Sequence, residues 1–227
     1  MEIIRPDEGE VLDIELEEDF LEKNRQLATE NRSLLDKYGI EAIDVMGSIG
    51  SGKTSLIRIL TSILKKKFRI GVIVGDLTTE IDAKGLEQPG VKVVQVNTGK
   101  ECHLDAKLVQ KALDSLPLKE LDVIFIENVG NLICPAEFPL GAHKRLVVIS
   151  VTEGPWMVVK HPYIFAEADV VAINKIDLSE AMQVSPEKLI QDLAKINTRA
   201  KAVLVSCRYR KGASQVLEAL GFSLNYA

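Results

Sequence analysis

Cysteine, histidine and aromatic residues are scarce in this 227-residue chain, and long runs of one residue class are missing. Three cysteines, an odd number, do not build a framework of paired disulfides. No apolar run approaches the ~18 residues of a membrane-spanning helix. The net charge is -5, and no block of Lys or Arg is longer than the "KKK" at 65–67. We therefore expect no membrane association and no nucleic-acid partner.

The overall composition is that of an ordinary globular protein, with 46% hydrophobic and 27% charged residues. At roughly 150 residues per domain, the length indicates one large domain, or one domain with a short extension. The first twenty residues are acidic and do not follow the charged-then-apolar pattern of a secretory signal. These features predict a cytoplasmic protein.

Two hydrophobic patterns divide the chain. Residues 1 to about 16 look like a loose acidic leader with Pro6 and Gly9 as breakers, and a helical pattern then runs to Gly39. Beyond Gly39, short apolar runs alternate with helical stretches, which predicts an α/β fold with a doubly wound, mostly parallel sheet covered by helices on both faces. The expected strands cover residues 42–46, 70–74, 91–96, 121–127, 145–151, 169–174 and 202–206, and the main expected helices cover 53–66, 103–114, 186–197 and 212–220.

The stretch "GSIGSGKT" fits the phosphate-binding pattern G-x-x-x-x-G-K-[ST], and it lies between an apolar strand and an apolar-periodic helix. Its glycines let backbone N–H groups turn inward around phosphates, and the helix N-terminus adds its positive end. Lys53 would reach the β- and γ-phosphates, and the Thr54 hydroxyl would bind Mg²⁺. The sequence thus predicts a P-loop NTPase whose nucleotide contacts come from Gly47, Ser48, Ile49, Gly50, Ser51, Gly52, Lys53 and Thr54.

The stretch "NKID" follows the apolar run "VVAI" and indicates which base is bound. The Asp177 carboxylate can accept hydrogen bonds from N1–H and the exocyclic amine of guanine, whereas adenine has no such pair of donors on that edge. The stem of Lys175 can cover the face of the base, and Asn174 completes the motif. We therefore predict GTP and GDP as ligands. Ser206 and Cys207 end the next strand, where a backbone N–H could meet guanine O6, although Cys207 also fits a small buried residue.

Two acidic residues follow strands where the phosphates are expected. Asp76 lies in "VIVGDLTTE" and Glu127 in "VIFIENVG". Mg²⁺ binds carboxylate oxygens directly or through water, so we predict a Mg²⁺ site made by Thr54, Asp76 and Glu127. Lys53, Asp76 and Glu127 are the candidate catalytic residues. Asp82 and Glu80 could share this role, but a solvated helix face suits each of them better.

The stretch "NTGKECHLDA" places Cys102 beside His103, and Cys134 lies seven residues beyond Glu127. Thiolate and imidazole ligands together suit Zn²⁺ or Ni²⁺ rather than Mg²⁺. The spacing is not that of a zinc finger, because it supplies three ligands instead of four. On these residues alone, a metal site and a pair of small buried cysteines beside a capping histidine are equally good interpretations.

Five stretches in this order resemble the HypB family of hydrogenase nickel-incorporation GTPases. They are "GSIGSGKT", "NTGKECHLDA", "ENVGNLICPAEF", "VTEGPWMVVKHP" and "NKIDL", and the resemblance spans about residues 20 to 222. It implies a slow, Mg²⁺-dependent GTPase and metallochaperone that helps to deliver Ni²⁺ to the large-subunit precursor of [NiFe]-hydrogenase, together with the accessory protein HypA. The family's metal ligands correspond to Cys102, His103 and Cys134. Residues 40–227 would form the GTPase domain with this site, and residues 1–39 the leader and N-terminal helix.

The family's GTP-dependent homodimerisation agrees with the ligand count, because two protomers with three ligands each can complete a shared Zn²⁺ or Ni²⁺ site. Some members carry an N-terminal Cys-x-x-Cys-Gly-Cys motif or a histidine-rich stretch, and neither precedes Cys102 here. High-affinity nickel storage is therefore not expected. His143 and His161 suit structural roles better than metal ligation, and Lys160 could reach a partner protomer or its nucleotide.

Our working hypothesis is a switch. GTP and Mg²⁺ would order the loops after Asp76 and Glu127 and thereby shift Cys134 relative to the Cys-His pair, so that metal and nucleotide affinities depend on each other. One alternative is a GTP-gated dimerisation module with a purely structural zinc site. A urease-type nickel maturation GTPase is a second alternative, which the sequence disfavours because that family's metal motif is Cys-Pro-His.

Overall fold

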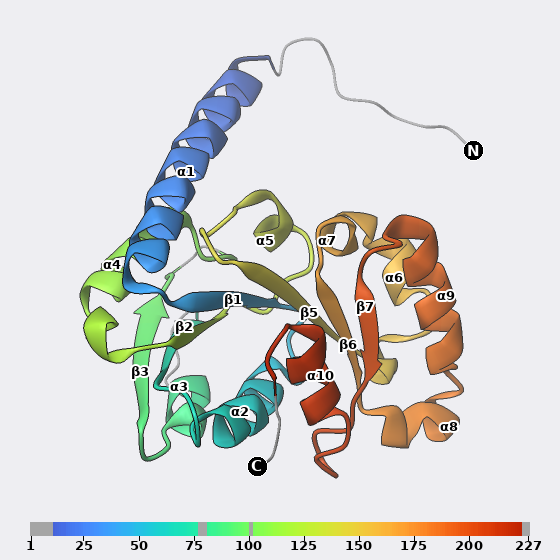
Figure 1. The fold of residues 1–227 in the computed structure, drawn as a ribbon. Coiled ribbons are helices and arrows are strands. Elements are labelled where there is room, and N and C mark those ends of the chain that lie inside the picture. Colours follow the sequence, from blue (N-terminus) through green and yellow to red (C-terminus); the bar gives the residue numbers. More distant parts are fainter. Residues whose placement is uncertain (1–10, 77–80, 100–101, 224–227) are drawn as a thin grey trace.

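The computed structural model describes residues 11–76, 81–99 and 102–223. Its centre is a seven-stranded sheet in the order β3-β2-β4-β1-β5-β6-β7, and every neighbouring pair of strands is parallel (Figure 1). The strands are β1 (Glu41–Met46), β2 (Ile70–Asp76), β3 (Val91–Asn97), β4 (Val123–Glu127), β5 (Lys144–Ser150), β6 (Val170–Asn174) and β7 (Lys201–Leu204).

Helices cover both faces of this sheet, as the alternation of patterns predicted. One face packs against α2, α3 and α10, while the other packs against α1 and α4 on one side and α6, α7 and α9 on the other. The helices are α1 (Val11–Tyr38), α2 (Lys53–Leu64), α3 (Ile81–Leu86), α4 (Ala106–Asp114), α5 (Cys134–Glu137), α6 (Met157–Lys160), α7 (Pro162–Ala166), α8 (Ser179–Met182), α9 (Pro186–Ile196) and α10 (Ala213–Ala219), with 3₁₀ turns η1 (Leu118–Glu120), η2 (Val151–Glu153) and η3 (Ile176–Leu178).

The central strands read as continuous apolar runs because both of their faces are buried. In β4, Val123 and Phe125 face α2 and α10, whereas Ile124 and Ile126 face α1 and α4. All four side chains are at most 1% exposed. Each such side chain stabilises the fold by about 1.5–3 kcal/mol through removal of apolar surface from water. The predicted α/β architecture, with a helix before the first strand, is therefore confirmed.

The N-terminal helix differs from the prediction at its start. It begins at Val11, so the expected leader to residue 16 is too long, and the remaining leader lies outside the described residues. Both breakers, Pro6 and Gly9, precede Val11, and no Pro or Gly follows before Gly39. Gly39 has φ +66°, the left-handed conformation that ends many helices, as expected. The division of the chain at residue 39 stays a prediction.

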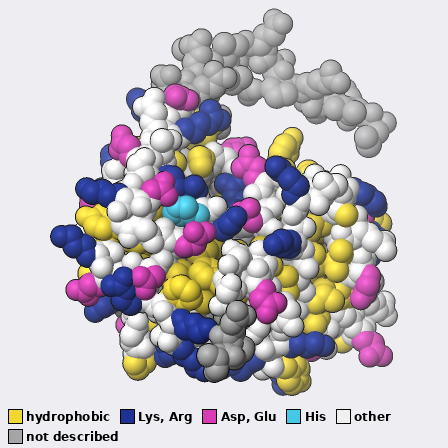
Figure 2. Space-filling model, in the orientation of Figure 1, with side chains coloured by type: hydrophobic (Ala, Val, Ile, Leu, Met, Phe, Trp, Pro, Cys, Tyr) yellow, Lys and Arg dark blue, Asp and Glu magenta, His cyan; other side chains and the backbone are white. Residues whose placement is uncertain are grey.

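The parallel strands all end at the same edge of the sheet, and this edge carries the predicted site residues. Gly47 follows β1, Asp76 ends β2, Glu127 ends β4 and Asn174 ends β6. Among the described residues, no helix is long and apolar enough to cross a membrane. On the face seen in Figure 2, the Lys and Arg side chains are interspersed with Asp and Glu.

Candidate nucleotide and metal sites

The phosphate-binding loop is closely packed against its neighbours. Gly47 has φ +149°, and a Cβ there would lie 2.1 Å from the carbonyl oxygen of Val148. Gly52 has φ +102°, and its Cβ would lie 2.2 Å from Nδ2 of Asn174. At both positions the backbone conformation and the space available require glycine. The loop is thereby held against β5 and the end of β6 with its backbone turned around the cavity.

The side chain of Lys53 folds back onto the start of this loop. Its Nζ donates hydrogen bonds of 3.0 Å to the carbonyl oxygens of Gly47 and Ser48. The side chain is buried, which lowers the pKa of Lys53, while the nearby Glu127 carboxylate opposes this shift. The ammonium group is therefore held at the loop by neutral carbonyl oxygens. A bound phosphate would pair with its positive charge.

Thr54 and Glu127 form the acidic side of the site. The Thr54 hydroxyl donates a 2.6 Å hydrogen bond to Oε1 of Glu127, and Glu127 is only 2% exposed. Burial raises the pKa of Glu127 to about 7, against the opposing effects of Thr54 and Lys53. Oε2 of Glu127 has no hydrogen-bond partner among the described residues. A hydroxyl beside a buried carboxylate with one unpartnered oxygen fits a Mg²⁺ site.

The "NKID" segment is tied to both neighbouring strands. The Asn174 amide donates to the carbonyl oxygen of Ser51 at 2.9 Å and accepts from the backbone N–H of Cys207 at 3.1 Å. The Ser206 hydroxyl donates to the Asp177 carboxylate. Lys175 has φ +58°, so the chain turns sharply after β6. Asn174 thus connects the phosphate-binding loop with the turn at Cys207, and Ser206 orients Asp177.

Most of these residues meet in one cavity of about 1020 Å³ at the carboxyl edge of the sheet. Gly47, Ser48, Ser51 and Ser206 do not line it but support residues that do. Asp82 lines it as well, although the sequence favoured a solvated helix face, and Glu80 lies outside the described residues. The sequence-predicted residues in the wall are Ile49, Gly50, Gly52, Lys53, Thr54, Asp76, Glu127, Asn174, Lys175, Asp177 and Cys207, and Arg58, Asn128 and Arg208 are additions that sequence reasoning missed.

The Cys-His pair meets Cys134 beside this cavity. The Sγ atoms of Cys102 and Cys134 are 3.0 Å apart, and Sγ of Cys102 is 3.8 Å from Nδ1 of His103. One ligand atom from each of the three residues lies within 4.8 Å of the others. The Cys102 thiol raises the pKa of the Cys134 thiol above its usual range. Two thiols and an imidazole this close suit Zn²⁺ or Ni²⁺ and leave one tetrahedral position for a further ligand.

An aromatic side chain that sequence reasoning missed supports the histidine. The rings of His103 and Phe138 are stacked with centroids 3.9 Å apart, and both side chains are buried. The ring of Phe20 in α1 contacts the Phe138 ring, with the two ring centroids 5.7 Å apart. The apolar residues at positions 20 and 138 gave no sign of this role, because neither lies near the Cys-His pair in sequence.

The other two histidines are not members of the Cys102, His103 and Cys134 cluster. Nδ1 of His143 accepts from the backbone N–H of Ala42 at 3.0 Å, and its Nε2 lies 2.9 Å from the Asp36 carboxylate. This is the structural role expected for His143. His161 separates α6 from α7, and Lys160 is exposed at the end of α6.

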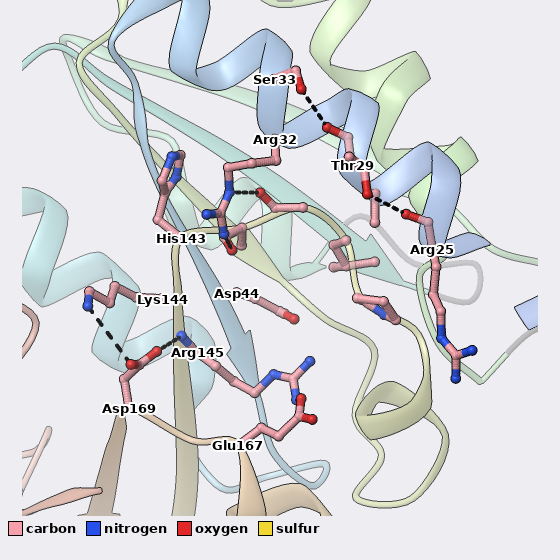
Figure 3. A pocket seen from close by; sticks show the side chains of 15 residues that line it. Arg25, Thr29, Arg32, Ser33, Asp44, His143, Lys144, Arg145, Glu167 and Asp169 are labelled. Carbon is pink, nitrogen blue, oxygen red and sulfur yellow. Dashed lines mark hydrogen bonds and ion pairs between the residues drawn. The ribbon is translucent and has the colours of Figure 1, made fainter. Parts of the chain in front are cut away.

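A second cavity, of about 480 Å³, lies between α1, β1 and the start of β5 (Figure 3). Its wall includes Asp44, which is 3% exposed, and Arg145, which pairs with Glu167 at 2.9 Å. Burial raises the pKa of Asp44 to about 6 although Arg145 and Asn128 favour its charged form. Arg145 pairs with Glu167 and Lys144 with Asp169, so part of the charge in this cavity is balanced within its own wall.

Comparison with known proteins agrees with this geometry. Residues 41–204 match the CobW/HypB/UreG nucleotide-binding domain. The probable hydrogenase maturation factor HypB of Methanocaldococcus jannaschii is 52% identical over 205 residues, which cover 90% of this chain and 93% of the relative. The chain belongs to the HypB family of hydrogenase maturation factors.

Two solved HypB structures share the fold. HypB from Archaeoglobus fulgidus is 41% identical with a TM-score of 0.83, over 89% of this chain and 99% of that one. HypB from Helicobacter pylori, crystallised in complex with nickel, is 36% identical with a TM-score of 0.82, over 87% and 93% of the two chains. The resemblance to the HypB family drawn from the sequence is thus confirmed, and the P-loop NTPase family implies nucleotide hydrolysis.

Proposed function

We propose that the chain is a GTP-hydrolysing metallochaperone for nickel insertion into [NiFe]-hydrogenase, in which nucleotide and metal binding influence each other. The loop after β4 carries this proposal, because it touches both sites within eight residues. Glu127 bonds Thr54, and an isolated β-bridge pairs Asn131 with Gly47. The same Asn131 donates to the carbonyl oxygen of Cys102 at 3.4 Å, and Cys134 follows three residues later.

Gly130 shows how little room this loop has beside the phosphate site. A Cβ at Gly130 would lie 2.3 Å from the side chain of Ile49 and 3.0 Å from its backbone. A change in the phosphate loop on GTP binding would therefore be felt directly at Gly130. Because packed elements shift between discrete arrangements, this contact supports a coupling between the γ-phosphate and the position of Cys134.

The geometry around the base supports guanine as the ligand. Asp177 lies in the wall of the large cavity and is held by the Ser206 hydroxyl, so one of its oxygens is already oriented. A carboxylate there would accept two hydrogen bonds from guanine. The Cys207 N–H donates to Oδ1 of Asn174, so Cys207 supports the motif, and its contact with guanine O6 stays a prediction.

Hydrolysis needs water to attack the γ-phosphorus while the bond to the β–γ bridging oxygen breaks, giving GDP and phosphate. Lys53 would hold the β- and γ-phosphates, with the loop backbone stabilising the charge that develops. Thr54, Glu127 and Asp76 would hold Mg²⁺, which when bound neutralises phosphate charge. Asp76 also lies where it could position water.

The open metal position supports a homodimer in the GTP-bound state. One protomer provides Cys102, His103 and Cys134, and a second copy could complete a shared Ni²⁺ or Zn²⁺ site. In nickel delivery, this homodimer would act in the cytoplasm. Its partners would be a HypA-type protein and the hydrogenase large-subunit precursor. The nickel complex of the H. pylori relative supports nickel as the cargo.

A single titration tests this proposal against a structural zinc site. Ni²⁺ and Zn²⁺ binding per protomer would be measured with GDP and with a non-hydrolysable GTP analogue, in the wild type and in Cys102→Ala. A delivery site gives a stoichiometry near one half with the analogue, affinities that differ between the nucleotides, and loss of binding in the variant. A site that holds Zn²⁺ equally tightly with both nucleotides would instead be structural, and unchanged binding in the variant would remove Cys102 from the site.

A further inference from the structure

Two chain segments carry the metal ligands. The first contains Cys102 and His103 and leads into α4, and the second runs from Asn131 to Ala142. Direct contacts between them include the thiol pair, the Asn131 bond to Cys102 and the stacking of Phe138 on His103. Helix α1 is a third element that forms hydrogen bonds to both segments.

Helix α1 supplies this connection through Asn24. Its side chain is 4% exposed and makes one hydrogen bond to each ligand segment. Oδ1 accepts from the backbone N–H of Ala106 at 2.8 Å, and Nδ2 donates to the carbonyl oxygen of Pro139 at 2.9 Å. Ala106 is three residues after His103, and Pro139 follows the Phe138 ring that stacks on His103. The Asn24 amide thus ties both segments to α1.

The same face of α1 repeats this arrangement two turns later. Asn31 is fully buried, and its Nδ2 donates to the carbonyl oxygens of Ala106 and Leu140 at 2.8 and 3.1 Å. Arg32 then donates to the carbonyl oxygens of Gly141 and Ala142 (Figure 3). Residues 139–142 therefore lie along α1 with every backbone carbonyl bonded to it.

Gly141 shows how closely residues 139–142 pack against α1, a contact called the α1 seam below. It has φ +92°, and a Cβ there would lie 2.4 Å from the carbonyl oxygen of Ala28 in α1. The second ligand segment is thus held against the helix by close backbone approach as well as by hydrogen bonds. Because buried amides are costly to leave unpaired, the α1 seam favours one arrangement of the two segments.

We propose that Asn24 is a positioning residue for the site made by Cys102, His103 and Cys134. From its place on α1, Asn24 keeps the two ligand segments close enough to each other for their side chains to bind one metal ion. This inference rests on the proposed metal-binding function. Loss of Asn24 would leave the Ala106 N–H and the Pro139 carbonyl unpaired and free His103 from its place beside Cys134. Residues that do not bind the metal themselves but hold its ligands in position typically contribute about 10–100-fold to metal affinity.

The test is a Co²⁺ and Ni²⁺ titration of the 227-residue chain, monitored by thiolate-to-metal charge-transfer absorption and by the Co²⁺ ligand-field bands. Asn24→Ala is expected to weaken binding by about 10–100-fold and to shift the ligand-field bands, while affinity for a fluorescent GDP analogue stays within twofold. Asn197→Ala is the matched control. Asn197 is also a buried amide bonded to backbone, at Phe165, Ala166 and Ala168, but neither it nor these partners line the nucleotide cavity or belong to the Cys/His cluster.

Gln26→Ala, an exposed change on α1, controls for helix substitution in general. If Asn24→Ala and Asn197→Ala lose metal affinity equally, or if Asn24→Ala binds metal like the wild type with unshifted bands, Asn24 is not a positioning residue. If Asn24→Ala does not fold, Asn24→Asp is used, which keeps the acceptor for Ala106 and removes the donor to Pro139, with the same expected band shift and weaker binding. A wild type without charge-transfer absorption, or with absorption that survives Cys102→Ala, refutes the metal site itself instead.

Discussion

Replacing Glu127 with glutamine would measure how unfavourable it is to keep a carboxylate buried beside the phosphate loop. Burial raises the pKa of Glu127 from 4.5 to about 7 in the folded chain. The protonated form is therefore favoured by folding. The stabilisation from this proton is fully present below the unfolded pKa and is lost as the pH rises through the folded pKa.

The size of the effect follows from the two pKa values. Between pH 5 and pH 8, Glu127 should remove about 2.5 kcal/mol from the free energy of unfolding, since one pKa unit corresponds to about 1.4 kcal/mol. Glutamine has the same shape, still offers Oε1 to Thr54, and does not titrate. The wild type should therefore lose about 2.5 kcal/mol more than Glu127→Gln over this range.

Urea denaturation of nucleotide-free protein at pH 5 and pH 8 measures this double difference, and groups common to both proteins cancel. Glu218→Gln, a change at an exposed glutamate on α10, provides the control and should follow the wild type. If Glu127→Gln and the wild type lose stability in parallel, the Glu127 carboxyl is not held protonated by burial. Adding Mg²⁺ and a GTP analogue near pH 7 should release about half a proton per site in the wild type only, because metal binding requires the carboxylate.

Four further predictions concern the two sites. Asp177→Asn should weaken GDP binding by about 10–100-fold in a fluorescent-nucleotide competition assay, because hydrogen bonds to a charged group contribute about 1.5–3 kcal/mol; unchanged affinity would place guanine recognition elsewhere. Thr54→Ala should lower the phosphate-release rate at least tenfold at saturating GTP, and raising the Mg²⁺ concentration should recover part of it. Gly52→Ala should abolish nucleotide binding, since its Cβ would lie 2.2 Å from Asn174, and calorimetry that finds normal binding would contradict the packing described. Because metal binding requires thiolates and the pKa of Cys134 is raised, Zn²⁺ affinity should increase from pH 6 to pH 8 in a chelator competition, and a Cys134→Ala variant should show a shallower increase.

The sequence predicted those features that depend on residues close together in the chain. Continuous apolar strands such as β4 indicated a sheet buried on both faces, and the phosphate loop is recognisable because its glycines, Lys53 and Thr54 are contiguous. Glu127 and the "NKID" segment each follow an apolar run directly, which predicts that both lie at the carboxyl edge of a parallel sheet. Each of these inferences needs only local spacing and the geometry of parallel sheets.

Residues whose roles depend on distant packing were missed or misjudged. Asn24 and Phe138 act on segments far from them in sequence, so no local pattern marks them. The place of Asp82 in the cavity wall could not be predicted, because helical periodicity does not say which side of a short helix faces a cavity. Helix α1 begins earlier than the sequence predicts, because an acidic composition is typical of a leader but is also favourable near a helix N-terminus.

The α1 seam also has a consequence for the order of folding. The Asn24 bond to Pro139 joins residues 115 positions apart, and the bond to Ala106 spans 82. Contacts of such long range form late, because the loops they close lose much conformational entropy first. During synthesis, the three metal ligands would therefore reach their final spacing only after residues 139–142 have packed against α1. The emerging chain would then pass most of its growth without a preformed thiolate site that could trap the wrong metal.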